Sequence, residues 1–324
     1  MNRQRGGALL AVLWLSAALS AVAFTVAHTV RGETERAATA ADGLRSYYLA
    51  TGGIERATVW MMWASYRTTD NQPRFWERGM PTLRFNFPTG EAVVEMIPES
   101  SKLRINSASE EDLARLMMQI GVDSGRAAGI AAAIVDWRTP SPVPTDLDAY
   151  YLGLPSSFRP AHTSFQEIEE LLLIRGMTPE IFYGWTERTP EGKLVTHTGL
   201  RDCVSIFGSS GAGGLDINTA QPGVMIAAGI PSDIVARIVR QRAVRPYKKE
   251  DLPALLQEHP STSRLIVGGR TVYTLRSTAR LKLANGQLSD LRRTVEAQVG
   301  RGEMSVNGKS WQILRWYDNA PRLQ

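Results

Sequence analysis

The sequence contains a single cysteine, Cys203, among its 324 residues. One cysteine excludes an intrachain disulfide and any zinc site built from several cysteines. The four histidines, His28, His162, His197 and His259, are scattered, and none belongs to an H-E-x-x-H pair. No serine lies in a G-x-S-x-G motif. These absences favour a protein that is not an enzyme.

Charge is missing from the 25 residues 6–30, which directly follow the basic residues Arg3 and Arg5. At about 1.5 Å per residue, a helix over this run is roughly 37 Å long, which exceeds a hydrocarbon core of about 30 Å. The sequence therefore predicts a membrane-inserted start. Because Arg3 and Arg5 precede the run, the positive-inside rule places the short N-terminal segment in the cytoplasm and the bulk of the chain outside.

Three kinds of membrane signal fit this run. A cleaved secretory signal has an apolar core at residues 8–19 and a small-residue cleavage site at 21–23. An uncleaved anchor keeps the whole segment. A prepilin signal is cut on the cytoplasmic side between Gly6 and Gly7, and the apolar run stays on the mature protein. The mature N-terminus distinguishes the alternatives, since secretory cleavage leaves Phe24 first and prepilin cleavage leaves Gly7 first.

The segment after the run favours its retention. Residues 33–62 contain no proline, and their apolar side chains follow one helical face. This pattern predicts one long helix, half apolar and half amphipathic, although an unrelated surface helix remains an alternative. Gly52 and Gly53 each cost about 1 kcal/mol relative to alanine within a helix, so a bend or break is possible there.

An internal repeat organises the middle of the chain. The segment Leu-Arg-Ile-Asn-Ser-Ala at residues 103–108 recurs as Leu-Asp-Ile-Asn-Thr-Ala at 215–220. Each copy precedes an apolar-periodic helix, a glycine turn at Gly121 or Gly229, and a second helix. The asparagine of each copy is expected to begin the first helix, because short polar side chains accept hydrogen bonds from first-turn amides. A proline-rich insertion at about 138–164 is present only in the first copy.

Strand-like segments flank this helical block. Residues 90–97 alternate in polarity, and further strands are expected at 271–283, 291–299 and 311–316. A tight turn at Asn285 and Gly286 separates the second and third of these strands, since both residues tolerate positive φ. The expected fold class is α+β: a pilin-like stem helix packs on an antiparallel sheet, and an all-α domain is inserted into that sheet.

The start of the chain resembles a known family. Arg-Gln-Arg-Gly-Gly-Ala-Leu-Leu, residues 3–10, and Tyr-Tyr-Leu-Ala-Thr-Gly-Gly-Ile-Glu-Arg-Ala, residues 47–57, look like the type II secretion minor pseudopilin K, or GspK. Further similar segments follow along the chain, at residues 103–108, 134–138, 150–152, 158–161, 174–180 and 217–220. The resemblance implies an inner-membrane protein that the prepilin peptidase cleaves between Gly6 and Gly7. It also implies N-methylation of the new terminus and a place at the tip of a short periplasmic pseudopilus.

The resemblance and the patterns together suggest a domain plan. Residues 1–6 form the leader, 7–30 the transmembrane helix, 31–97 the stem and first part of the head, 98–265 the inserted domain, and 266–324 the C-terminal strands. Two helix-hairpin-helix or SAM-like units are expected within the insertion, at about 103–190 and 215–258. The implied partners are other minor pseudopilins of the I, J and H types, the inner-membrane secretion platform and the prepilin peptidase.

One position departs from most pilins. They carry a glutamate as the fifth residue of the mature chain, and here that position is Ala11. A carboxylate in hydrocarbon is costly unless it is paired. In pilins its partner is thought to be the terminal amine of the subunit above, so a tip subunit has no use for the acid. The alternative is that a simple anchor needs no acid.

Hairpin units also raise a rival function, a membrane-anchored DNA receptor. DNA-binding hairpins offer backbone amides of a glycine-rich turn to phosphate. Here the second glycine is missing, Asp123 would repel phosphate, and Pro231 has no amide to donate. A basic group keeps this alternative open, although such a run is more often a solvated face; it consists of Arg237, Arg240, Arg242, Arg245, Lys248 and Lys249. On the pseudopilin interpretation no nucleic acid is bound.

No cofactor is required on this interpretation, and calcium is the one ion considered, because some members of the family bind it in the helical domain. The candidate ligands are Asp136, Asp146 and Asp148, with Glu169 or Glu170 from the following helix. Arg138 argues against the site, since relatives carry further acids after the tryptophan. Plain surface acids are the alternative. Residues 208–214, rich in glycine and serine, lack the Lys-Ser/Thr of a phosphate loop and are expected to be a linker. A third alternative is an exported hydrolase without a recognised motif.

Overall fold

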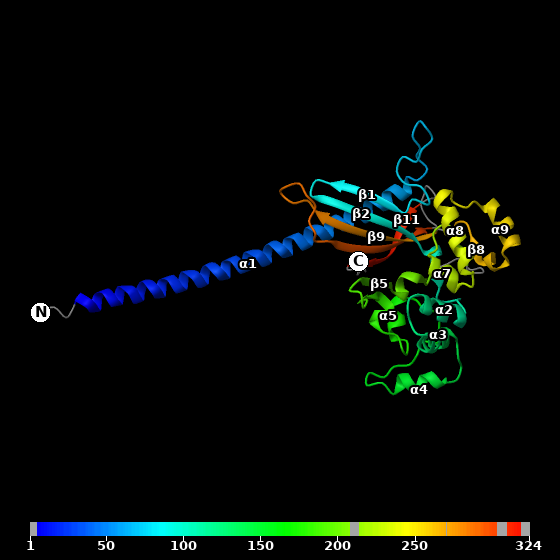
Figure 1. Ribbon diagram of the computed structural model, residues 1–324, viewed down its shortest axis with the longest axis horizontal. Helices are drawn as coiled ribbons and strands as arrows, with labels where there is room; N and C mark the ends of the chain where they lie inside the picture. The colour runs from blue at the N-terminus through cyan, green and yellow to red at the C-terminus, as the bar shows by residue number, and fades with distance from the viewer. Residues whose placement is uncertain (1–4, 208–213, 270, 303–309, 319–324) are drawn as a thin grey trace.

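The computed structural model describes residues 5–207, 214–269, 271–302 and 310–318. Its longest element is the helix α1 (Arg5–Met62). The first half of α1 projects alone, and the second half lies along a sheet (Figure 1). The expected glycine linker lies outside the described residues except for Gly214.

The helix α1 is continuous through Gly52 and Gly53, so the chain does not break at either glycine. A Cβ atom on Gly53 would lie 2.6 Å from Ser277 Oγ and 2.9 Å from Ala92 Cβ. Glycine at this position therefore permits close approach of the helix to the sheet. The propensity cost of glycine is offset by packing that the sequence pattern did not reveal.

The sheet is antiparallel and has the strand order β1-β2-β9-β10-β11. Its strands are β1 (Thr82–Phe87), β2 (Gly90–Pro98), β9 (Val272–Leu281), β10 (Arg293–Gly302) and β11 (Ser310–Tyr317). Four of these strands match the expected segments, and β1 was not expected. The prediction of a long apolar N-terminal helix followed by an antiparallel sheet is thus confirmed.

One face of the sheet packs on α1 because apolar side chains alternate along its strands. The buried cluster that joins helix and sheet includes Ile54 and Met61 of α1, Val94 of β2, Leu275 of β9 and Ala297 of β10. This cluster is the core of the head domain. The opposite face of the sheet carries polar side chains such as Thr274 and Glu296, and these contact the inserted region.

The turn between β9 and β10 differs in detail from the expectation. Gly286 has a positive φ of 82°, whereas the φ of Asn285 is not positive. The Asn285 side chain accepts a hydrogen bond from the Gln287 amide at 3.0 Å instead. Glycine alone therefore supplies the left-handed residue of this turn.

The chain leaves the sheet after Pro98 and re-enters it at Val272, so the inserted region extends past residue 265. Strand β8 (Leu265–Ile266) pairs in parallel with β7 (Leu215–Asp216) inside this region. Its main helices are α2 (Glu110–Gln119), α3 (Ser124–Arg138), α4 (Asp146–Leu152), α5 (Pro179–Tyr183), α6 (Leu200–Cys203), α7 (Pro222–Ala227), α8 (Ser232–Val244) and α9 (Leu252–Glu258).

The inserted region also contains strands, so it is not purely helical as expected. An antiparallel hairpin joins β4 (Gly184–Arg188) to β5 (Leu194–Thr198). The two-residue strands β3 (Leu103–Arg104) and β6 (Val204–Ser205) form a second parallel pair. Short 3-10 turns complete the region at Glu99–Ser101, Ile168–Leu173, Lys249–Asp251 and Pro260–Arg264.

The two sequence repeats have matching hydrogen bonds. Asn106 Nδ2 donates to the Phe165 carbonyl at 3.0 Å, and Asn106 Oδ1 accepts from the Phe165 amide at 2.8 Å. Asn218 makes the same two bonds to Tyr247, at 2.9 and 2.8 Å. The asparagines therefore tie each copy to its aromatic residue. The expectation that they begin helices is wrong, since α2 has Ser109 as its N-cap.

A second shared feature involves an arginine near the end of each second helix. Arg138 donates to the carbonyls of Ile105 and Ala108, and Arg242 donates to those of Ile217 and Ala220. Buried carbonyls left outside regular structure need such partners. The same pair of bonds in both copies shows that the repeated sequence folds twice into the same local structure.

The inserted region emerges at the end of the sheet that lies beside the C-terminal end of α1. Gly90, at the start of β2, is adjacent to Leu49 of α1, and a Cβ there would lie 2.6 Å from Leu49 Cδ2. At the other end of the strand, Pro98 pairs with Tyr273, whose ring lies 5.6 Å from Trp76 just beyond α1. Figure 1 accordingly shows the helical region at the end remote from the N-terminus.

Candidate functional site

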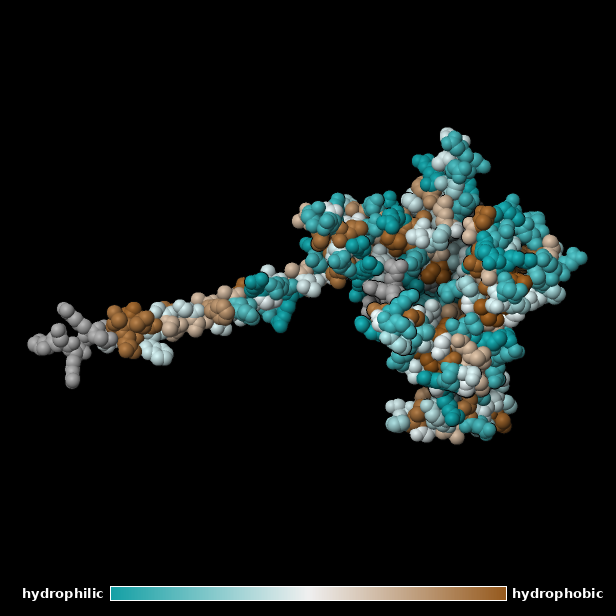
Figure 2. Space-filling view, in the orientation of Figure 1, coloured by the Kyte–Doolittle hydropathy of each residue, from teal (hydrophilic) through white to brown (hydrophobic). Residues whose placement is uncertain are grey.

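The exposed part of α1 is the first candidate functional surface. Among the described residues one helix is long and apolar enough to cross a membrane, and its most apolar part is not buried. Figure 2 shows brown apolar residues at the start of the stem, followed by a teal hydrophilic band. On this helix Arg31 pairs with Glu35 at 3.0 Å, and Arg36 pairs with Glu33 at 2.9 Å. These exposed pairs follow directly after the uncharged run.

The predicted processing residues lie at the start of this helix. Gly6 and Gly7 fall in the first turns of α1, and a Cβ on Gly7 would meet no atom within 4 Å. Ala11 is exposed on the same helix. The geometry leaves this end of the chain accessible, and cleavage between Gly6 and Gly7 stays a prediction.

A buried ionic network fastens the inserted region to the outer face of the sheet. Arg276 of β9 binds Asp202 of α6 at 2.6 Å and also binds Glu296 of β10. Arg201 reaches the same Glu296 at 2.9 Å. Burial alone would lower the pKa of Arg276, but the carboxylates of Asp202 and Glu296 outweigh burial and raise it. The side chain of Glu296 is only 3% exposed, so this network holds the two parts in one orientation.

A second buried carboxylate lies at the point where the chain leaves the sheet. Glu99 is paired with Lys102 at 2.8 Å and accepts hydrogen bonds from Thr274 of β9, at 2.6 Å, and from Ser205 of β6. Sequence reasoning missed both Glu99 and Arg276. Arg276 and Glu296 lie at polar positions of the strand alternation, on the face away from α1, so the local pattern assigned them to solvent and did not indicate their burial.

A cleft of about 580 Å³ remains beside this junction. Its walls are the β2 residue Glu95, the β9 residue Arg276, Thr196 and Thr198 of β5, and Gln221 before α7. The charged side chains of this cleft pair with each other, because the guanidinium group of Arg276 also lies 3.8 Å from the Glu95 carboxylate. The cleft is therefore a gap in the interface between the head and the inserted region.

The turn of the first hairpin unit is flanked by the β4-β5 hairpin. Gly121 has a φ of 100°, and a Cβ on it would lie 2.9 Å from His197 Nδ1 and 3.3 Å from the Trp185 ring. Trp185 and His197 come from the β4-β5 hairpin, and their rings stack at a centroid distance of 4.4 Å. The hairpin was not expected from the sequence. It lies against the turn on one side, and Gly121 itself remains exposed.

Half of the basic group near the second unit is engaged in contacts within the protein. Arg237 pairs with Glu258 at 2.8 Å, and Arg245 pairs with Asp251 at 3.1 Å. Arg242 donates hydrogen bonds to the backbone carbonyls of Ile217 and Ala220. Arg240, Lys248 and Lys249 are exposed. The structure thus provides no evidence for DNA binding by the two units.

Two of the three calcium candidates come together, and they meet a histidine. Asp136, Asp148 and His162 each offer one ligand atom, and these atoms all lie within 4.8 Å of one another. His162 Nε2 lies 2.9 Å from Asp148 Oδ1, and His162 Nδ1 lies 3.2 Å from the Asp136 carbonyl oxygen. Asp146 is exposed and does not join this group.

The donor set is a poor fit for calcium, which takes six to eight oxygen ligands. An imidazole nitrogen replaces one carboxylate, Arg138 points to backbone carbonyls, and Glu170 accepts from the amides of Gln166 and Glu167. Burial alone would lower the pKa of His162, but hydrogen bonds to Asp148 and to the Asp136 carbonyl outweigh burial and raise it. A protonated His162 then pairs with Asp148 and ties the proline-rich insertion to α3.

A long exposed apolar helix that continues onto an antiparallel sheet defines a membrane-anchored, pilin-like protein. Residues 91–184 match the model of the family described as "Type II secretion system (T2SS), protein K". This range covers most of β2 and the first part of the inserted region. No curated protein matches the chain.

A solved structure is similar over nearly the whole chain. It is a chain of "the GspK-GspI-GspJ complex from enterotoxigenic Escherichia coli Type 2 Secretion System", at 15% sequence identity and a TM-score of 0.52. The similarity covers 87% of this chain and 98% of that chain. At this identity the match shows a shared fold. Together with the family match, it confirms the resemblance to type II secretion minor pseudopilin K expected from the sequence.

Proposed function

We propose that this protein is a minor pseudopilin at the tip of a type II secretion pseudopilus, where it begins and caps assembly. The observation that carries the proposal is the location of the inserted region beside the C-terminal end of α1. In a filament built from stem helices, that end faces away from the membrane. The inserted region, about 170 residues between Pro98 and Val272, lies at this point and hinders the addition of another subunit above it.

The junction supports this role because it is rigid. Arg276 and Glu99 link the inserted region to the central strands of the sheet through buried ion pairs and hydrogen bonds. A loosely tethered domain could swing aside and let a subunit stack above. Charges buried in a fixed arrangement resist that movement, since separating them leaves an unpaired charge in a dry environment.

The stem supports incorporation into a filament from below. We infer cleavage between Gly6 and Gly7, N-methylation of Gly7, a single pass through the inner membrane and a periplasmic location for the rest. The neutral Ala11 agrees with a subunit that has none above it. The two repeated units, at about 103–190 and 215–258, are inferred to be SAM-like hairpins whose packed faces contact partners rather than nucleic acid.

The proposed partners are other minor pseudopilins of the I, J and H types, the inner-membrane platform and the prepilin peptidase. The similar solved chain is named as part of a complex with GspI and GspJ, which supports this choice. We propose no enzymatic activity and no required cofactor. Calcium at Asp136 and Asp148 stays a proposal with weak support, because His162 fills part of the space between them.

Sequencing the N-terminus of the native protein tests the proposal. We expect Gly7 as the first residue, and a Gly6→Leu variant should keep the full leader because the peptidase requires glycine before the cut. The matched control is Ala23→Leu, which alters the alternative secretory site and should leave processing unchanged. A chain that begins at Phe24 would exclude the pseudopilin.

Co-purification gives an independent test of the assembly role. We expect the full-length chain, extracted in mild detergent, to bring pilin-like subunits with it. Duplex DNA retained at physiological salt, without such subunits, would instead favour the DNA receptor.

A further inference from the structure

A pocket of about 270 Å³ lies beside the C-terminal end of α1, and we call it the distal pocket. Met61 of α1, Trp76 and Trp311 of β11 form its apolar floor, and all three are buried. Arg67, Arg78 and Arg301 form its rim. This volume suits one or two side chains rather than a large ligand.

The rim of the distal pocket is positively charged. Arg67 is paired with Glu77 at 3.2 Å, which neutralises one of the three arginines. Arg78 and Arg301 are exposed, and neither forms an ion pair with the described residues. The pocket therefore presents, above an apolar floor, two guanidinium groups that have no ion-pair partner among the described residues.

The floor contains a polar group that lacks a partner. Trp76 is 1% exposed, and its indole N–H donates to no acceptor among the described residues. A buried donor without an acceptor costs about 1–3 kcal/mol. A carbonyl or carboxylate oxygen of a ligand that enters the pocket would satisfy this donor after a small shift of the ring.

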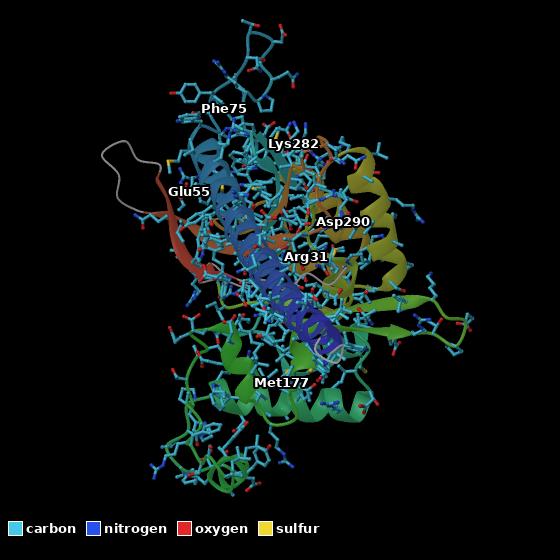
Figure 3. The ribbon with its side chains drawn as sticks, turned by 90° about the vertical axis from the view of Figure 1, so that its left-hand side faces the viewer. Arg31, Glu55, Phe75, Met177, Lys282 and Asp290 are labelled. Atoms are coloured by element: carbon cyan, nitrogen blue, oxygen red, sulfur yellow. The ribbon has the colours of Figure 1, made fainter. Side chains whose placement is uncertain are left out.

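An aromatic ridge adjoins the distal pocket. Trp63 and Tyr66 are 43% and 57% exposed, and the ring of Phe75 lies 5.0 Å from that of Trp63 and 6.2 Å from that of Tyr66. Figure 3 shows Phe75 at the base of the loop that projects from the head. Exposed aromatic and arginine side chains together are typical of protein-binding surfaces.

We infer that the distal pocket binds an acidic peptide segment of another protein, with one apolar or aromatic side chain of that segment seated on the floor. Carboxylates would pair with Arg78 and Arg301, since guanidinium groups bind carboxylates in a bidentate manner. A membrane lipid is not the occupant, because residue 62 lies 32 residues beyond the uncharged run, roughly 48 Å along the helix. Two rim cations are too few for the repeated phosphate contacts of nucleic acid.

This inference does not rest on the pseudopilin role, since the pocket is formed within one chain. It goes beyond that role by assigning a ligand class to the membrane-distal end.

The test uses the full-length chain in detergent and a fluorescein-labelled, end-blocked hexapeptide, Glu-Asp-Phe-Glu-Asp-Leu. Fluorescence anisotropy should show saturable binding. A peptide with lysine in place of every acidic residue should bind at least 10-fold more weakly. Binding of the two peptides with equal affinity, or no anisotropy change up to millimolar protein, would overturn the inference.

Variants locate the binding. Arg78→Ala combined with Arg301→Ala should weaken the acidic peptide at least 10-fold, and so should Met62→Glu at the pocket edge. The matched control is Arg188→Ala, an exposed arginine on β4, which should leave the affinity unchanged. Because the rim residues are exposed, unchanged thermal unfolding of the double variant is expected. Unchanged peptide affinity in that variant would place the binding elsewhere and refute the proposed site, and so would displacement of the peptide by equimolar duplex DNA.

Discussion

Gly53 of the stem helix and Ser277 of the central strand β9 are in direct contact. A Cβ on Gly53 would lie 2.6 Å from Ser277 Oγ. The hydroxyl belongs to a side chain that is fully buried between helix and sheet. The stem and the head therefore meet most closely where the helix has no side chain.

Substitution of this glycine should loosen the stem. Gly53→Ala gains about 1 kcal/mol of helix propensity but forces the helix and sheet apart, which typically costs 1–3 kcal/mol. We expect a lower melting temperature for the full chain. Gly43→Ala is the matched control, since a Cβ there meets nothing within 4 Å, and it should raise the melting temperature slightly. An equal rise in both variants would contradict the close contact.

The repeated asparagines should be sensitive to truncation. Asn218→Ala leaves the amide and carbonyl of Tyr247 without their side-chain partner, at a cost of about 2–4 kcal/mol in unfolding free energy. Asn218→Asp keeps the acceptor and loses the donor, so a smaller loss is expected. Gln241→Ala, on the exposed face of α8, should change stability by less than about 0.5 kcal/mol. Chemical denaturation measures all three.

The rigid junction should depend on Arg276. Arg276→Met removes one of the two arginines that pair with the buried Glu296, and it also removes the arginine that pairs with Asp202. Breaking such a buried pair costs about 3–5 kcal/mol. Hydrogen exchange should increase in β9, β10 and α6. Arg31→Met removes an exposed pair with Glu35 and is the control, with little change expected. Unaltered exchange at the junction in Arg276→Met would show that packing alone holds the inserted region.

Asp112 links stability to pH. Burial alone would raise its pKa, but hydrogen bonds and charge from Arg264, with hydrogen bonds from Ser109, outweigh burial and lower it. A carboxyl whose pKa is lowered on folding stabilises the fold fully above its unfolded value, about pH 4, and this contribution is lost as the pH falls through the lowered value. Wild-type unfolding free energy should therefore drop more steeply below pH 4 than that of Asp112→Asn. Parallel pH profiles would rule out this linkage.

Cys203 should be unreactive in the folded protein. Burial, and secondarily the charge of Asp202, raise the pKa of its thiol to about 12. Compared with an ordinary thiol of pKa about 8.5, its thiolate fraction at pH 8 is lower by about three orders of magnitude. Labelling with a maleimide should be negligible in native buffer and complete in guanidinium chloride. Rapid labelling of the native chain would show that the inserted region opens.

Several features followed from the sequence because they depend on neighbouring residues. The absence of charge over 6–30 marked the stem, and alternation of polarity marked β2, β9, β10 and β11. The strand β1 has the same alternation, with Leu83 and Phe85 buried, and was readable but overlooked. The β4-β5 hairpin was not readable in this way, because none of its strand residues is buried and its packing on Gly121 is a long-range contact.

The repeated Ile-Asn motif shows where sequence reasoning stops. Its recurrence predicted two similar units, but the asparagines were assigned to helix starts. Asn106 instead bonds the backbone of Phe165, 59 residues away, and Asn218 bonds that of Tyr247, 29 residues away. A short polar side chain can serve a nearby amide or a distant one, and the choice depends on which backbone groups folding leaves unpaired.

The sequence by itself determined the membrane stem, the strands and the presence of two related units, because hydrophobic burial is read from composition and period along a short stretch of chain. Only the tertiary structure decided how the inserted region is held and where it points. Those properties depend on partners far apart in the chain, such as Thr274 and Glu99, which are separated by 175 residues and bonded at 2.6 Å. Such pairs form only after the sheet is assembled, since the free energy of a buried polar contact depends on the surroundings that the whole fold creates.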